Sequence, residues 1–177
     1  MVKDKNIIII RSKKRKKTIQ AKDIKGKIFV YLPAAMDKER EQKYIREIIK
    51  KMEEKKKREK LNSNGLLTKR AEELNRKYFD GKLKFEIKYV TNQKSKFGSC
   101  SPKSGKIRIS DRISNMPRWV RDYVIIHELA HLVHPNHSKE FWNLVNRYKY
   151  AERAKGYLIA VGMAADKKIE NNDIGDD

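Results

Sequence analysis

The four histidines of this 177-residue chain all lie between positions 127 and 137. The stretch reads His-Glu-Leu-Ala-His-Leu-Val-His-Pro-Asn-His, an HExxH motif followed after five residues by a further histidine. Apolar residues precede the motif at 124–126 and fill it at 129–130 and 132–133. They predict a buried helix, and a buried helix needs partners for its polar side chains. This requirement constrains the fold more than any other feature of the sequence.

The spacing of these residues matches a catalytic zinc site. His127 and His131 project from one face of a helix, one turn apart, so both imidazoles can reach one Zn²⁺ at about 2.0–2.1 Å. Glu128 can reach a water on the metal without binding the metal. Zinc lowers the pKa of such a water toward about 7, and the carboxylate takes its proton. Pro135-Asn136 ends the helix, so His137 can return as a third ligand and leave a fourth position open.

Two further residues, His134 and Cys100, have alternative interpretations. His134 can be a hydrogen-bond donor that supports a ligand, a transition-state stabiliser, or a residue that caps the end of the helix. Cys100 is the single cysteine, which excludes an intramolecular disulfide. Its thiol can be a fourth metal ligand that silences the site, or a small buried side chain, as free cysteines often are.

The positive charge of the chain is concentrated in its first third. The 44 Lys and Arg exceed the 23 Asp and Glu by 21, and residues 1–60 hold 22 of the basic and 9 of the acidic residues. One basic run supplies the candidate polyanion-binding residues Arg11, Lys13, Lys14, Arg15, Lys16 and Lys17. Because few aromatic residues interleave with these lysines, we expect contacts with nucleic-acid phosphates rather than base stacking.

Local patterns divide the chain at the breaker Asn62-Ser63-Asn64-Gly65. Before it we predict a basic antiparallel meander and a long helix, with strands at 6–10, 18–24 and 28–32 and a helix that Asp37 caps and that ends near residue 60. After it we predict helices at 66–79, from Ser114 or Asn115 to 134, at 138–150 and 152–161, and strands at 83–90, 95–101 and 106–110. The expected domains are 1–62 and 63–165, with a disordered acidic tail at 166–177.

Residues 127–142, with the sequence HELAHLVHPNHSKEFW, resemble the HELxHLxHxNHSxxFW signature of the YgjP-like metallopeptidases. The segments 97–101 and 105–109 are similar to the WGSCS…G.I.L part of that family, with Phe97 in place of Trp, and 11–18 resembles its RRS.RRKT opening. The resemblance implies a compact zincin-like α+β domain with an active-site helix and a small antiparallel sheet. It implies Zn²⁺ on His127, His131 and His137, with Glu128 as general base.

The resemblance also places a substrate cleft beside Gly98, Ser99 and Cys100, because a zincin usually binds its peptide as a strand added to a sheet edge. The same histidine spacing occurs in the related WLM and SprT-like groups, some of which cleave proteins crosslinked to DNA. The implied function is therefore that of a zinc metallopeptidase. The related groups suggest proteins associated with nucleic acid as its targets.

Two other functions fit the same residues. A basic zincin-like pocket can hydrolyse a phosphoanhydride of a nucleotide, and a polyanion-binding protein can use zinc as a structural ion. The intact HExxH glutamate favours an enzyme, because a structural site does not use that residue. The sequence contains no apolar run of about 18 residues and no secretory signal, so we expect a cytoplasmic protein that makes no membrane contact.

Overall fold

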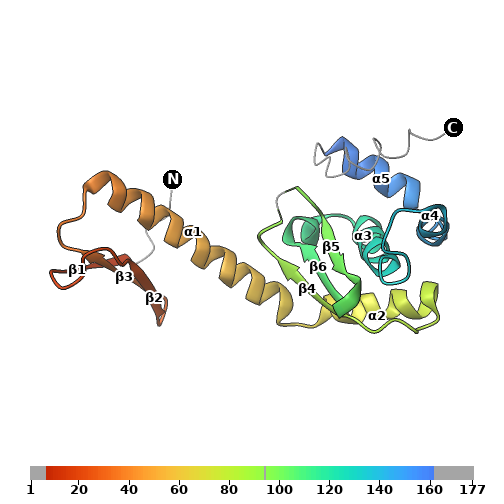
Figure 1. Cartoon of the computed structure of the whole chain (residues 1–177), viewed down its shortest axis with the longest axis horizontal. Coiled ribbons are helices and arrows are strands. Elements are labelled where there is room, and N and C mark those ends of the chain that lie inside the picture. The colour runs from red at the N-terminus through yellow and green to blue at the C-terminus, as the bar shows by residue number, and fades with distance from the viewer. Residues whose placement is uncertain (1–6, 94, 162–177) are drawn as a thin grey trace. The chain divides into compact units, whose positions relative to one another are not determined.

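The computed structural model describes residues 7–93 and 95–161 and has an α+β fold, as the sequence predicts. The chain forms two compact units, Met1–Lys55 and Lys56–Asp177, and the division falls inside the long helix α1 (Lys38–Asn62) (Figure 1). The expected acidic tail at 166–177 lies outside the described residues. In the part of the chain described, no helix is both long enough and apolar enough to cross a membrane.

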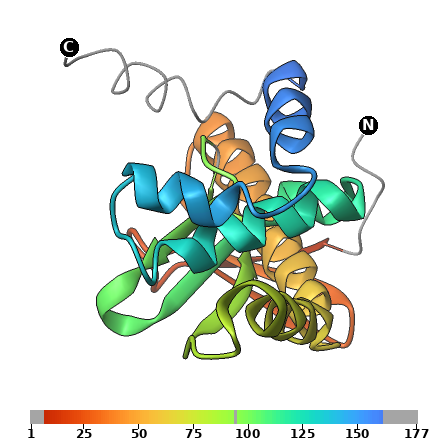
Figure 2. The ribbon, with the colours of Figure 1, turned by 90° about the vertical axis from the view of Figure 1, so that its right-hand side faces the viewer.

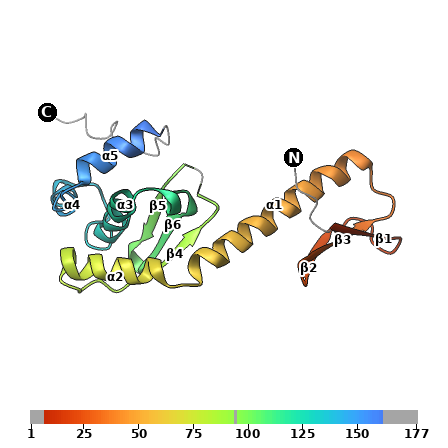
Figure 3. The same ribbon diagram turned by 180° about the vertical axis from the view of Figure 1, so that it is seen from behind.

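The first unit is a three-stranded sheet with the N-terminal part of α1 along one face (Figure 3). Its strands are β1 (Ile7–Ser12), β2 (Gln20–Ile24) and β3 (Lys27–Pro33). Alternate residues of β3 are buried and form a small core of Ile28, Val30 and Leu32. This core packs against Ile45, Ile48 and Met52 of α1. The Asp37 carboxylate accepts hydrogen bonds from the backbone N–H groups of residues 39 and 40, so the predicted cap is confirmed.

The predicted antiparallel meander is wrong in its order and in one pairing. The strand order is β1-β3-β2, with β2 antiparallel to β3 and β1 parallel to it. The most apolar strand takes the centre, where both of its edges are paired. The long basic connection between β1 and β2 lets β2 lie one strand position away from β1. Strand β3 then occupies the position between them.

The second unit contains α2 (Leu66–Phe79), β4 (Glu86–Val90), β5 (Gly98–Ser101), β6 (Lys106–Ser110), α3 (Arg118–Ala130), α4 (Lys139–Val145) and α5 (Ala151–Ala160). Short 3₁₀ turns at Pro102–Ser104 and Asp111–Asn115 connect these elements. Helix α3 packs against the sheet, α2, α4 and α5, so it is the central element of this unit (Figure 2).

The second sheet repeats the topology of the first. Its order is β4-β6-β5, with β5 antiparallel to β6 as a local hairpin and β4 parallel to β6. The expected small antiparallel sheet is therefore a mixed sheet. Strand β6 is central because Ile107 and Ile109 are almost fully buried. Strand β5 is left at an edge, next to α3.

The structure changes the predicted boundaries of two helices. Helix α3 begins after Pro117, because residues 111–115 form a 3₁₀ turn in which the Ser114 hydroxyl donates to the Asp111 carbonyl at 2.6 Å. Helix α4 begins after Ser138, as predicted, but ends at Val145 rather than near residue 150. Its N-cap is confirmed, since the Ser138 hydroxyl accepts from the Phe141 N–H at 3.4 Å.

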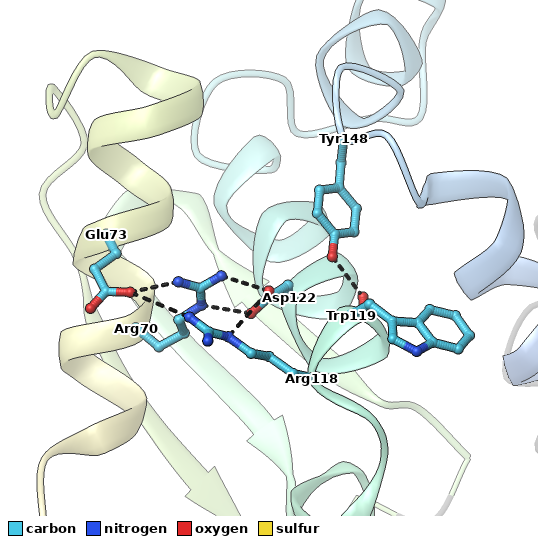
Figure 4. A network of polar contacts seen from close by, with 6 residues as sticks. All are labelled: Arg70, Glu73, Arg118, Trp119, Asp122 and Tyr148. Atoms are coloured by element: carbon cyan, nitrogen blue, oxygen red, sulfur yellow. Dashed lines mark hydrogen bonds and ion pairs between the residues drawn. The ribbon is translucent and has the colours of Figure 1, made fainter.

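A buried carboxylate fixes α3 to α2 five residues before the histidine motif. Asp122 accepts from Nε of Arg70 at 2.7 Å and from a terminal nitrogen of Arg70 at 2.6 Å (Figure 4). Arg70 also donates to Glu73 at 2.5 Å, and Arg118 lies at 3.9–4.0 Å from both carboxylates. This network holds the helix that carries the motif in a defined position against its neighbour.

Candidate active site

The histidine motif lies where α3 ends and the chain turns back. The α-helix ends at Ala130 rather than at residue 134, and the next turn tightens: the N–H groups of Val133 and His134 both donate to the Ala130 carbonyl, at 3.0 and 2.9 Å. The chain then passes Pro135 and returns toward the helix. This early stop brings His137 back to His127, as the sequence predicts for a third ligand.

Ring nitrogens of His127, His131 and His137 all lie within 4.8 Å of one another. The Nε2 atoms of His127 and His137 are 3.2 Å apart. Two nitrogen ligands of a tetrahedral zinc at about 2.05 Å would be about 3.3 Å apart. These three histidines therefore fit a divalent metal. Among the residues that the structure describes, they form the one group of side chains that could hold a metal ion.

A backbone carbonyl orients the middle histidine. Nδ1 of His131 lies 3.3 Å from the His134 carbonyl oxygen, so it is the nitrogen that donates, and Nε2 remains for a metal. From the sequence, the His134 side chain is a candidate for this supporting role. The structure shows this role for the His134 backbone, which a motif search cannot find because any residue at this position has a carbonyl.

Two aromatic rings of α4 pack against the imidazoles. The Phe141 ring stacks on His131 with centroids 4.5 Å apart, and the Trp142 ring stacks on His137 at 5.4 Å. Phe141 is fully buried. These contacts restrict the rotation of both imidazoles and exclude water from one side of the histidine cluster.

Burial keeps the imidazoles of His127 and His131 neutral, which is the form that binds metal. It lowers the pKa of His127 well below its usual 6.5, and the nearby His131 and His137 lower it further. Burial and the neighbouring His137 lower the pKa of His131 to about 4. At neutral pH, both side chains are therefore ready to act as ligands.

Glu128 is buried between α3 and the β5 strand. It is 5% exposed, and the backbone of Gly98 lies directly against its carboxylate. A Cβ at position 98 would lie 2.7 Å from Cγ and 2.8 Å from Cδ of Glu128. The sequence grouped Gly98 with the substrate cleft but did not predict this contact, because it joins two segments that are thirty residues apart.

Cys100 lies near Glu128 but outside the histidine group. Burial, reinforced by the charge of Glu128, raises the pKa of the thiol to about 12. The described metal-binding group does not include its sulfur. This environment agrees with the interpretation of Cys100 as a small, partly buried side chain rather than as a fourth metal ligand. Ser99, next to it on β5, accepts a hydrogen bond from Gln93 at 2.7 Å.

The basic residues of the run 11–17 lie in the first unit and differ in their environment. Arg11 makes two hydrogen bonds to the Glu41 carboxylate, at 2.5 and 3.0 Å. Arg15 stacks over Tyr31 and donates to Gln20. The remaining side chains are exposed; they are Lys13, Lys14, Lys16 and Lys17.

The profile of the family described as "YgjP-like, metallopeptidase domain" matches residues 2–155. The chain belongs to the YgjP-like metallopeptidase family. This YgjP-like protein is therefore a hydrolase of the metallopeptidase class, and its family implies a divalent metal and peptide or protein substrates.

Two solved structures are similar to the YgjP-like chain. One is the metallopeptidase zymogen abylysin of Pyrococcus abyssi, with 24% identity and a TM-score of 0.47 over 54% of this chain and 91% of that chain. The other is the metallopeptidase zymogen jannalysin of Methanocaldococcus jannaschii, with 21% identity and a TM-score of 0.47 over 53% of this chain and 94% of that chain. None of the curated proteins matches.

Proposed function

We propose that this YgjP-like protein is a zinc-dependent peptidase in which His127, His131 and His137 hold the ion and Glu128 is the general base. The observation that carries the proposal is the convergence of three partly buried imidazoles, with a buried glutamate next to the first of them in the sequence. Three imidazole ligands suit Zn²⁺, and three protein ligands leave one position open, which is the pattern of catalytic rather than structural zinc.

When bound, zinc would polarise a carbonyl and make a nearby water more acidic. The chain supplies the remaining groups. The Glu128 carboxylate, held between α3 and β5, accepts the proton of the attacking water and then donates it to the leaving amine. The His134 carbonyl fixes the tautomer of His131, and the rings of Phe141 and Trp142 keep the imidazoles in place.

We propose that the peptide binds along β5. Among the described strands β5 pairs only with β6, so its other edge offers backbone N–H and C=O groups to an added strand. Gly98 on this strand contacts Glu128, and this contact supports the proposal because a peptide on this edge would lie close to the proposed general base. Affinity would then come from hydrogen bonds to the backbone of the substrate. Because every peptide has the same backbone, we expect the protein to accept substrates of many sequences.

The test combines metal analysis with hydrolysis assays on unstructured proteins and on nucleoside triphosphates. Glu128→Gln should keep one zinc per chain and lose roughly 10²–10⁴-fold in peptide turnover, because the amide cannot take a proton. The matched control Glu152→Gln removes an exposed carboxylate on α5 and should leave turnover unchanged. Turnover retained in Glu128→Gln contradicts the role of this residue. Hydrolysis of triphosphates without hydrolysis of proteins contradicts the peptidase proposal.

A further inference from the structure

The sheet of the first unit has a second face that α1 does not cover. The β1 and β3 partners Ile7 and Ile28 belong to the core with α1, so their neighbours along each strand point to the opposite side. We call this side the outer face. The register places six of its residues in adjacent rows: Ile8, Ile10, Gln20, Lys22, Phe29 and Tyr31.

The outer face presents apolar and aromatic surface. Phe29 and Tyr31 are only partly buried, although they lie on the central strand. Ile8 and Ile10 flank them on β1 and remain 37% and 36% exposed. The aromatic residues are two apart on one strand, so their side chains project in parallel about 7 Å from each other. Such a pair offers two successive stacking platforms.

The same segment is strongly basic. Residues 7–33 contain nine Lys and Arg and one acidic residue, Asp23. Arg15 connects the basic run to the outer face, because its guanidinium lies 5.5 Å from the Tyr31 ring centroid and donates to Gln20 at 3.3 Å. Lys22 is paired with Phe29 across the strands and is exposed. Arg11, in contrast, belongs to the α1 side and is neutralised by Glu41.

We propose that the outer face binds single-stranded nucleic acid, with bases stacked on Phe29 and Tyr31 and phosphates held by Lys22 and the 13–17 lysines. Charge complementarity favours a polyanion, and the aromatic pair favours one whose bases are free to stack. In a duplex the base faces are covered by their neighbours. The sequence predicts phosphate contacts rather than stacking, because the aromatic residues lie on β3 and the basic run lies mostly in the connection after β1. Only the folded sheet brings the two together.

The experiment measures the binding of fluorescein-labelled dT20 and rU20 to the full-length protein by anisotropy, at several salt concentrations. Wild-type protein should bind both single strands more tightly than a 20-base-pair duplex. The double variant Phe29→Ile, Tyr31→Ile keeps strand-forming side chains and should weaken binding roughly tenfold or more, with the same salt dependence. Lys22→Gln should lower the slope of log K against log salt by about 0.7 for each phosphate that is no longer neutralised.

Matched controls change α1 instead of the outer face. Tyr44→Ile removes an exposed aromatic ring, and Lys50→Gln removes an exposed charge. Both should bind like wild type, and thermal melting confirms that every variant is folded. The proposal is overturned if the aromatic double variant binds single strands like wild type. It is also overturned if heparin or duplex DNA binds as tightly as the single strands, because charge alone would then explain the affinity.

This inference stands apart from the proposed peptidase chemistry, since the measurement is binding and the residues belong to the first unit. A protein that binds single strands but hydrolyses no protein would overturn the proposed function and support the outer face. A protein that hydrolyses peptides but binds no single strand would support the proposed function and overturn the outer-face proposal.

Discussion

The backbone of Gly98 lies against the carboxylate of Glu128, with no room for a side chain between them. The contact joins the edge strand β5 to the helix α3, so the main chain of β5 limits the space open to the Glu128 side chain. A glycine at this position lets β5 approach Glu128 closely, and under the proposed function this brings the substrate edge to the general base. Glycine commonly serves this purpose where a backbone must come close to another group.

Gly98→Ala should therefore reduce peptide turnover. The added methyl would overlap the Glu128 side chain, and the carboxylate must shift to accommodate it. A displacement of about 1 Å at a catalytic group can lower the rate roughly 100-fold. Zinc content should remain at one per chain, because the three histidines are not displaced. A variant with wild-type kcat would show that the close contact has no catalytic role.

The control for this change is Gly156→Ala on α5. A Cβ at this position would meet nothing within 4 Å, and alanine is favoured over glycine inside a helix by about 1 kcal/mol. We expect a higher Tm and unchanged turnover. The comparison separates the effect of the contact with Glu128 from the general effect of replacing a glycine.

Asp122→Ala should destabilise the second unit by about 2 kcal/mol, as measured by urea unfolding. The change leaves Arg70 without the carboxylate that accepts two of its hydrogen bonds, although Glu73 still pairs with it. Glu86→Gln, which removes an exposed carboxylate from a surface pair, should change the stability by less than about 0.5 kcal/mol. Equal effects of the two changes would contradict a structural role for the buried pair.

The sequence predicted the elements of this fold better than their neighbours in space. Helix α2 and strand β6 have the predicted bounds, since apolar spacing and the breakers around them are local signals. The parallel pairs β1–β3 and β4–β6 were missed. Pairing across a sheet depends on which strand is buried most deeply, and that is a property of the assembled unit.

The same distinction applies to the candidate site. The three histidines were predicted to converge because helix periodicity and a proline stop determine the distances between them, and the structure brings their ring nitrogens together. The contact of Gly98 with Glu128 was not predicted. It depends on the packing of β5 against α3, for which local periodicity offers no signal.

Trp142→Leu should weaken zinc binding about tenfold, as measured by competition with a chelating dye. The indole stacks on His137 with an interplanar angle of 23°, and without it the imidazole gains rotational freedom that metal binding must remove. Trp119→Leu is the matched control, because that indole packs edge-on against Tyr157. If both variants bind zinc alike, the stacking contact does not orient the ligand.

The metal-free protein should lose stability as the pH falls from 6.5 toward 4. The pKa of His131 is lowered from 6.5 to about 4, and that of His127 is lowered in the same direction, so in this range the unfolded chain takes up protons that the folded protein does not. The free energy of unfolding therefore decreases on acidification and is flat above pH 7. Urea midpoints of EDTA-treated protein at pH 7.5, 6 and 5 measure this slope, in a window above the usual pKa of carboxylates. His131→Gln, which cannot be protonated, should show a shallower slope, and a wild-type midpoint that stays constant down to pH 5 would contradict the buried, neutral state of these imidazoles.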